Sequence, residues 1–181
     1  MLTEEQNQIV HTAVSGHNLL ITGKAGTGKS FLVNELVKVL TSRGKKVVVL
    51  CSTGIACTVY DEELRCAVST LHSFYGLGTA DLPWPMVVQR STSNNLVSER
   101  VKEVDVIIVD EISMMSRRIL EIANKIHYEL CDDDTRLQSL PFGGKQLIFV
   151  GDFLQLRPVP NVFDNGSFVF MSPVFKKAIT H

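Results

Sequence analysis

The glycine-rich segment from residue 23 to residue 30 constrains the fold of this chain more than any other feature. It follows the apolar run Leu19–Ile21 and consists of Gly23, Lys24, Ala25, Gly26, Thr27, Gly28, Lys29 and Ser30. This is the spacing of a phosphate-binding loop that leaves a β-strand and begins an α-helix. Its glycines allow a tight turn, and its amides form an anion site together with the start of the helix. The segment favours an α/β domain that binds a nucleoside triphosphate over a glycine-rich turn without a ligand.

Each residue type in the loop has a chemical task. The ammonium of Lys29 would reach the outer phosphates, and the hydroxyl of Ser30 would hold Mg²⁺. The predicted cofactors are therefore ATP and Mg²⁺. The backbone around the phosphates would be provided by Gly23, Ala25, Gly26, Thr27 and Gly28.

Composition narrows the class of protein. A length of 181 residues suits one α/β domain, and a net charge of −1 gives no global basic field for nucleic acid. The chain has no apolar run long enough to span a membrane, and its polar N-terminus does not resemble a targeting signal. We therefore expect an intracellular protein, nuclear or mitochondrial in a eukaryote and otherwise cytoplasmic. We expect reduced thiols at Cys51, Cys57, Cys66 and Cys131.

Apolar segments alternate along the chain with the periods of strands and helices. Helical spacing is expected at residues 3–14, 31–40 and 119–130, and strands are expected at 18–22, 47–50, 104–109 and 146–150. The central strands are apolar on both faces, which is typical of a buried parallel strand. The pattern predicts a central parallel sheet with helices on both faces.

Three segments do not fit this alternation. Residues 60–68 are a polar insertion, for which we expect a loop or a short hairpin. Residues 76–99 contain prolines and a polar run, and we expect largely irregular surface there. Residues 131–141 carry three adjacent aspartates, for which a solvated acidic loop is a better interpretation than a metal site.

Two carboxylates directly follow the third expected strand. In a parallel sheet ligands bind at the carboxyl ends of strands, so Asp110 would lie near the phosphate loop and hold Mg²⁺. Glu111 would orient and deprotonate the attacking water, and Gln155, after the fourth strand, would contact the γ-phosphate or that water. The alternative is that the two carboxylates cap the helix that follows them.

Taken together, the ordered motifs resemble those of superfamily-1 DNA helicases of the Pif-one (petite integration frequency) type. The matching segments are Leu2-Thr3-Glu4-Glu5-Gln6, the phosphate loop, Ser52-Thr53-Gly54-Ile55-Ala56, Thr70-Leu71-His72-Ser73-Phe74, Asp110-Glu111-Ile112-Ser113-Met114, and Pro141-Phe142-Gly143-Gly144 running into Gly151-Asp152-Phe153-Leu154-Gln155-Leu156. The resemblance covers nearly the whole chain and implies a RecA-like P-loop NTPase fold.

The resemblance implies further roles at the matching positions. Gln6 would recognise adenine, because a side-chain amide both donates and accepts hydrogen bonds. For Phe74 the alternative is a place in the core, and for His72 it is a buried, hydrogen-bonded position. The residues that would contact the phosphates and bases of single-stranded DNA are Thr53, Gly54, His72, Ser73 and Phe74.

A member of this family would be an ATP-driven helicase that moves 5′ to 3′ on single-stranded DNA. We expect residues 1–181 to form one motor core without the second core and its arginine finger. An arginine finger contributes about a thousandfold or more to phosphoryl transfer, so the chain alone would bind Mg·ATP, hydrolyse it slowly and bind DNA weakly, as a monomer. Two other functions remain open: a non-translocating, degenerate or transposon-derived ATP-binding switch, and a small-molecule kinase.

Overall fold

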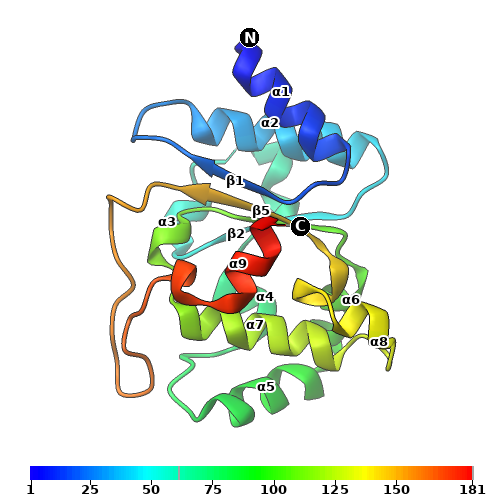
Figure 1. Ribbon diagram of the computed structural model, residues 1–181, viewed down its shortest axis with the longest axis vertical. Helices are drawn as coiled ribbons and strands as arrows, with labels where there is room; N and C mark the ends of the chain where they lie inside the picture. Colours follow the sequence, from blue (N-terminus) through cyan, green and yellow to red (C-terminus); the bar gives the residue numbers. More distant parts are fainter. Residues whose placement is uncertain (61, 181) are drawn as a thin grey trace.

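Five parallel strands form the central sheet of the protein, in the order β1-β5-β4-β2-β3 (Figure 1). The computed structural model describes residues 1–60 and 62–180, without the side chains of residues 65 and 66. The strands are β1 (Leu19–Thr22), β2 (Val47–Cys51), β3 (Val68–Thr70), β4 (Val106–Val109) and β5 (Gln146–Gly151). Four of them confirm the expected strands, and β3 is an addition.

Helices cover both faces of the sheet, but unequally. One face carries α1 (Glu4–Val14) and α2 (Lys29–Ser42), which lie above the sheet in Figure 1. The thicker layer below it contains α5 (Trp84–Ser93), α7 (Arg117–Glu129) and the C-terminal α9 (Pro173–Thr180). The remaining helices are α3 (Gly54–Cys57), α4 (Leu71–Tyr75), α6 (Asn95–Glu103) and α8 (Thr135–Gln138), with 3-10 helices η1 (Glu62–Ala67), η2 (Ile112–Met114), η3 (Pro141–Gly144) and η4 (Val169–Met171).

Alternation along each central strand divides the core into two clusters. Val106 and Ile108 of β4 point into the cluster under α1 and α2, whereas Ile107 and Val109 point into the larger cluster on the other face. All four side chains are buried. The strand is therefore apolar on both faces because helices cover both, as expected for a parallel sheet.

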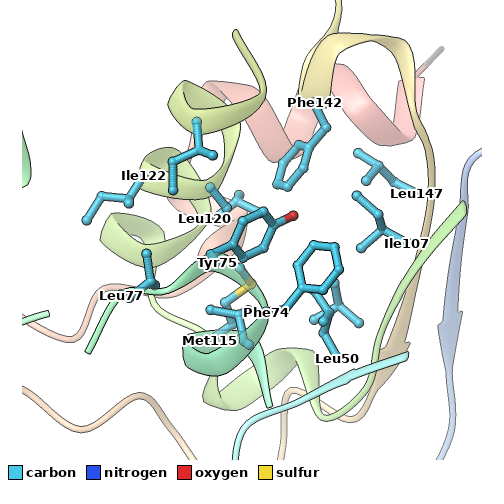
Figure 2. Packing of buried hydrophobic residues seen from close by; sticks show 14 of the residues in the cluster. Leu50, Phe74, Tyr75, Leu77, Ile107, Met115, Leu120, Ile122, Phe142 and Leu147 are labelled. Carbon is cyan, nitrogen blue, oxygen red and sulfur yellow. The ribbon is translucent and has the colours of Figure 1, made fainter. Parts of the chain in front are cut away.

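The Pro-Phe-Gly-Gly segment contributes to the larger cluster (Figure 2). Phe142 has a positive φ of 53° and places its ring in the core, 5.2 Å from the ring of His127. Its backbone amide donates to Asn124 Oδ1 of α7 at 2.8 Å. At Gly143 a Cβ would lie 2.6 Å from Cys131 Sγ, so only glycine fits there. This motif therefore connects the start of β5 to α7.

The expectation of an irregular surface at residues 76–99 is wrong, because two helices occupy most of that segment. In α5 (Trp84–Ser93), proline occurs only at the N-terminal end, where a missing amide costs little. Val87 and Val88 of this helix are buried against the larger cluster. Their packing stabilises a helix that could not be predicted from its amino-acid composition.

The polar run within that segment is also part of helical structure. The hydroxyl of Ser93 donates to the Gln89 carbonyl at 2.6 Å, within α5. Asn94 Oδ1 accepts a hydrogen bond from the Val97 amide at 3.2 Å and caps the start of α6. Residues that compete with a helix elsewhere thus end one helix and begin the next.

The two other segments that did not fit are more ordered than expected. Residues 62–67 form η1 and lead into β3, which is too short for a period-two pattern to be recognised. Asp134 caps the short helix α8 within the acidic segment. Cys51, Cys57 and Cys131 are free thiols, as expected, whereas the thiol of Cys66 lies outside the described residues. No helix among the described residues is long and apolar enough to span a membrane.

A buried polar pair joins α4 to α7. The hydroxyl of Tyr75 lies 2.9 Å from His127 Nε2, and both side chains are buried. Burial, with the nearby charge of Lys145, lowers the pKa of His127 from 6.5 to about 3. The folded protein therefore holds a neutral imidazole, whose Nε2 forms a hydrogen bond with the tyrosine hydroxyl.

This pair predicts acid sensitivity. The folded pKa is below the unfolded one, so stability is fully present above pH 6.5 and is lost as the pH falls towards 3. At about pH 4.5 the loss from this group alone is about 2–3 kcal/mol. Urea unfolding of wild type and of the double variant Tyr75→Phe/His127→Phe, at pH 7 and pH 4.5, measures it. The double variant should lose less stability between the two pH values than wild type does.

The exposed His11 provides the control for this experiment. His11→Gln should retain the full pH dependence of wild type. An unchanged pH dependence in the double variant would show that His127 does not carry the effect.

Candidate nucleotide and nucleic-acid site

The phosphate loop joins β1 to α2 in the expected strand-turn-helix arrangement. Gly26 and Gly28 have φ values of 79° and 82°, in the left-handed region that favours glycine. The hydroxyl of Thr27 donates to the Lys24 carbonyl at 2.7 Å, which stabilises the turn. Lys29 Nζ donates to the carbonyls of Gly23 at 2.5 Å and Lys24 at 2.7 Å. Its ammonium therefore lies against the loop, within reach of an anion bound by the loop amides.

The residues of the loop fit a bound Mg·nucleotide. Ser30 is exposed at the first turn of α2, and Ala25 is exposed within the loop. Ser30 and Asp110 offer a hydroxyl and a carboxylate, which are the oxygen ligands that Mg²⁺ prefers. The side chain of Gln6 lies beside the loop, because a Cβ at Gly28 would be 3.4 Å from Gln6 Nε2.

A capping box holds Gln6 in that place. The amide of Thr3 donates to Gln6 Oε1 at 3.0 Å, and the amide of Gln6 donates to Thr3 Oγ1 at 3.1 Å. The two bonds fix the first turn of α1 and the glutamine side chain together. Gln6 Nε2 is thus held on the side of the phosphate loop.

The carboxylates of Asp110 and Glu111 lie at the carboxyl end of β4. Asp110 Oδ1 accepts the Glu111 amide at 2.8 Å, and its Oδ2 accepts the hydroxyl of Tyr60. Glu111 has left-handed backbone angles (φ 52°, ψ 47°), and its Oε2 accepts the hydroxyl of Ser52 at 2.8 Å. Glu111 occupies the N-cap position of η2, but its side chain makes no capping bond there, so the helix-cap alternative holds for its position and not for its carboxylate.

Tyr60 is a site residue that the sequence did not single out. It lies in the polar insertion, yet its side chain is only 3% exposed and its hydroxyl contacts Asp110. Burial, followed by the negative charge of Asp110, raises the pKa of Tyr60 well above its ordinary value. The phenol therefore remains a proton donor to the carboxylate. No local sequence pattern predicts this contact, because Tyr60 and Asp110 are 50 positions apart.

A cavity of about 280 Å³ connects the carboxylate pair to two of the expected DNA motifs. Its wall includes Ser52, Thr53, His72, Asp110 and Glu111. Thr53 is exposed, although its hydroxyl also accepts the Ala56 amide at 3.2 Å and caps α3. Burial lowers the pKa of His72, so the imidazole that faces the cavity is neutral. The structure therefore brings residues expected to act in hydrolysis and residues expected to contact DNA to the wall of one cavity.

The remaining DNA candidates differ in exposure. Gly54 and Ser73 are exposed, whereas Phe74 is 6% exposed and packs edge-on against Tyr75 with ring centroids 4.9 Å apart. The core alternative therefore describes Phe74, and its ring is not available to stack on a base. His72 is half-buried and lines the cavity. Its burial is intermediate between that of an exposed DNA contact and that of a core histidine.

Arg100 is a second residue that the sequence did not single out. From α6 it donates to the carbonyls of Ser73 and Phe74, and its guanidinium lies 5.7 Å from the centre of the Phe74 ring. It thus fixes the end of α4, the helix that carries His72. Its helix α6 begins within residues 76–99, the segment that we expected to be irregular, so no sequence pattern indicated this contact.

Gln155 is exposed in the loop after β5, and the structure places it away from the cavity wall. Its amide donates to the Asp152 carbonyl at 3.1 Å, within its own turn. The strand before it comes close to the carboxylate pair, because a Cβ at Gly151 would be 3.0 Å from the amide nitrogen of Ile112. Gly151 therefore allows the end of β5 to lie beside the turn of Glu111.

The sequence that carries this site matches a family of known proteins. The sequence profile described as PIF1-like helicase matches residues 1–173. The chain belongs to the PIF1-like helicase family.

Individual proteins agree with this assignment to the PIF1-like helicases. ATP-dependent DNA helicase PIF1 of Saccharomyces cerevisiae is 35% identical over 187 residues, which cover 98% of this chain and 20% of the yeast protein. The crystal structure of Pif1 helicase from Candida albicans has a TM-score of 0.84 at 35% identity, covering 100% of this chain and 39% of that one. Pif1 helicase from Bacteroides in complex with ADP-AlF3 and ssDNA has a TM-score of 0.74 at 28% identity, covering 98% and 40%.

These structures confirm the RecA-like fold. The chain spans only a fifth of the length of the yeast relative that it matches. The likeness therefore concerns one part of a larger architecture in those proteins.

The anchoring by Arg100 is testable. Arg100→Met removes hydrogen bonds from a charged donor to two backbone carbonyls of α4, which should lower the free energy of unfolding by about 1.5–3 kcal/mol. Urea unfolding followed by circular dichroism measures the change. The exposed Arg43 offers a matched control, and Arg43→Met should leave the midpoint within error of wild type. Equal midpoints for the two variants would contradict the role of Arg100.

Proposed function

We propose that this chain is the nucleotide-binding motor core of an ATP-dependent DNA helicase. The observation that carries the proposal is the cavity in which the carboxylates of Asp110 and Glu111 meet the segments of Thr53 and His72. A phosphate loop on the same sheet supplies the remaining half of a hydrolytic site. The names of the relatives and the ssDNA complex of the Bacteroides protein support this choice. Movement from 5′ to 3′ on single-stranded DNA is proposed from family resemblance alone.

The roles follow from residue chemistry. The loop amides and Lys29 bind and neutralise the phosphates, while Ser30 and Asp110 hold Mg²⁺. Bound Mg²⁺ supplies charge stabilisation at the transferred phosphoryl group. Glu111 orients a water molecule and accepts its proton, and Gln155 senses the γ-phosphate once nucleotide is bound.

Further roles belong to recognition. Gln6 recognises the adenine edge, and its position beside Gly28 supports that role. Thr53, Gly54 and Ser73 offer hydroxyls and amides to the phosphates of a single strand, and His72 lines the cavity that also contains the carboxylates. We omit Phe74 from this surface because its ring is buried.

We further propose that residues 1–181 form one motor core that works with a second. Closure of two lobes on ATP is the general way in which such motors hold and move a substrate. The single core should therefore bind Mg·ATP weakly, as a monomer, and hydrolyse it slowly. An arginine from a second core would add about a thousandfold or more to the hydrolysis rate.

Lys29→Ala tests the nucleotide half of the proposal. Loss of a charge-assisted contact of about 1.5–3 kcal/mol should lower the affinity for a fluorescent ADP analogue about 10- to 100-fold. In a longer protein that carries both cores, the same change should abolish ATP hydrolysis and unwinding together. The affinity for single-stranded DNA should remain largely intact, because Lys29 lies on the nucleotide side.

The exposed Lys45 at the turn before β2 provides the matched control, and Lys45→Ala should bind the nucleotide analogue as wild type does. The helicase proposal fails if unwinding survives Lys29→Ala.

A further inference from the structure

Both carboxylates of the pair are held by hydroxyls from one segment, the connection between β2 and β3. Ser52, at its start, donates to Glu111 Oε2 at 2.8 Å, and Tyr60, further along, donates to Asp110 Oδ2. We call Ser52 and Tyr60 the hydroxyl pair. They come from a different part of the chain than the residues that they hold, so the contacts depend on the tertiary fold.

The order of the strands gives the direction of this contact. β4 lies between β5 and β2, and the phosphate loop follows β1 on the far side of β5. Ser52 therefore reaches Glu111 from the side of β4 opposite to β1, whereas Tyr60 packs in the smaller cluster, on the face of the sheet that α1 and α2 cover.

The connection also carries part of the proposed DNA surface. Thr53 and Gly54 directly follow Ser52, and both are exposed. Thr53 also caps α3, which lies between Ser52 and Tyr60. A movement of Thr53 would therefore change the backbone that connects the two hydroxyls. A strand bound at Thr53 would thus act on the segment that holds both carboxylates.

We propose that Ser52 and Tyr60 are positioning residues that orient Glu111 and Asp110, and that through them single-stranded DNA at Thr53 is coupled to binding of Mg·nucleotide. This inference rests on the proposed function and adds the path between its two halves. Tyr60 fixes the carboxylate that holds the metal, and Ser52 fixes the carboxylate that acts on water. Neither residue touches the reacting atoms.

The chemistry of the contacts suits this role. Hydrogen-bonding partners of a metal-binding carboxylate fix its orientation, and loss of one typically costs about tenfold or more in metal affinity. Tyr60 is 3% exposed, so water does not replace its hydroxyl easily. Ser52 also lies 3.4 Å from Met114 Sδ, which limits the side-chain positions open to it.

The first experiment separates metal from nucleotide. A fluorescent ADP analogue is titrated into wild type and Tyr60→Phe, once with Mg²⁺ and once with EDTA. Tyr60→Phe should retain wild-type affinity in EDTA and lose about tenfold of the gain that Mg²⁺ provides. Tyr128 lies away from the site on α7, and Tyr128→Phe is the matched control that should keep the whole gain.

The second experiment measures coupling. In wild type, a thymidine oligonucleotide should raise the affinity for Mg·ADP several-fold, and Mg·ADP should raise the affinity for the oligonucleotide by the same factor, as linkage requires. In Ser52→Ala/Tyr60→Phe this factor should fall to about one. Ser52→Thr keeps a hydroxyl and should retain most of the coupling. The exposed Ser93 of α5 gives the control variant Ser93→Ala.

The outcomes separate this inference from the proposed function. Wild type that binds Mg·ADP and oligonucleotide, with coupling and metal gain unaffected in Ser52→Ala/Tyr60→Phe, overturns the inference and leaves the proposed function standing. Wild type that binds neither ligand overturns both. If Tyr60→Phe lost as much affinity for the ADP analogue in EDTA as in Mg²⁺, Tyr60 would have a structural role only. That result would overturn its positioning role.

If Tyr60→Phe folds poorly, an NMR measurement on the wild-type protein tests the inference instead. The chain has three tyrosines, so labelling of their Cζ carbons gives three resonances. The Tyr60 resonance should move when Mg²⁺ is added to the nucleotide complex, and the Tyr128 resonance should not. A Tyr60 resonance that ignores Mg²⁺ overturns the inference.

Discussion

The parallel pairing of β2 with β4 is the constraint on which the site depends. The register sets Leu50 opposite Val109, and the Asp110 amide donates to the Leu50 carbonyl at 2.9 Å. Because the two strands run in the same direction, the segments that follow them leave the sheet at the same edge. Ser52 and Glu111 become neighbours for this reason, although 59 positions separate them. A slip of one residue would turn every side chain of β4 to the opposite face.

The two halves of the site, the phosphate loop and the segment of His72, pack against different faces of the sheet. The phosphate loop continues into α2, which packs with α1 over the smaller cluster. The segment of His72 belongs to α4, which is held from the other face by Arg100 and by the Tyr75–His127 pair. Contacts between the halves therefore pass through the strand ends, where the hydroxyl pair lies.

Much of this arrangement could be predicted because it is local. The phosphate loop is a contiguous pattern, and β2, β4 and β5 are continuous apolar runs that only a buried strand explains. The position of Asp110 and Glu111 follows from where β4 ends. The same locality explains β1 and the capping box at Thr3, in which a residue caps its own helix.

The parts that could not be predicted depend on long-range contacts. α5 consists of residues that suit a loop, and it is helical because Val87 and Val88 bury against the larger cluster. Tyr60 contacts Asp110 only when β2 and β4 pair. Phe142 has a positive φ, which a non-glycine residue rarely adopts, and its ring packs in the core. A hydrophobic pattern records how apolar a segment is but not which partner will cover it.

The choice of hydroxyls around the carboxylate pair has a physical reason. A lysine or arginine beside Asp110 would neutralise the charge that a divalent cation needs, whereas a hydroxyl orients a carboxylate and leaves its charge in place. The ion pairs recorded among the described residues lie elsewhere, on helix surfaces and loops. Asp110 is held instead by a phenol and by a backbone amide. Hydrogen bonds from neutral groups thus orient the carboxylate of Asp110, as the proposed Mg²⁺ site requires.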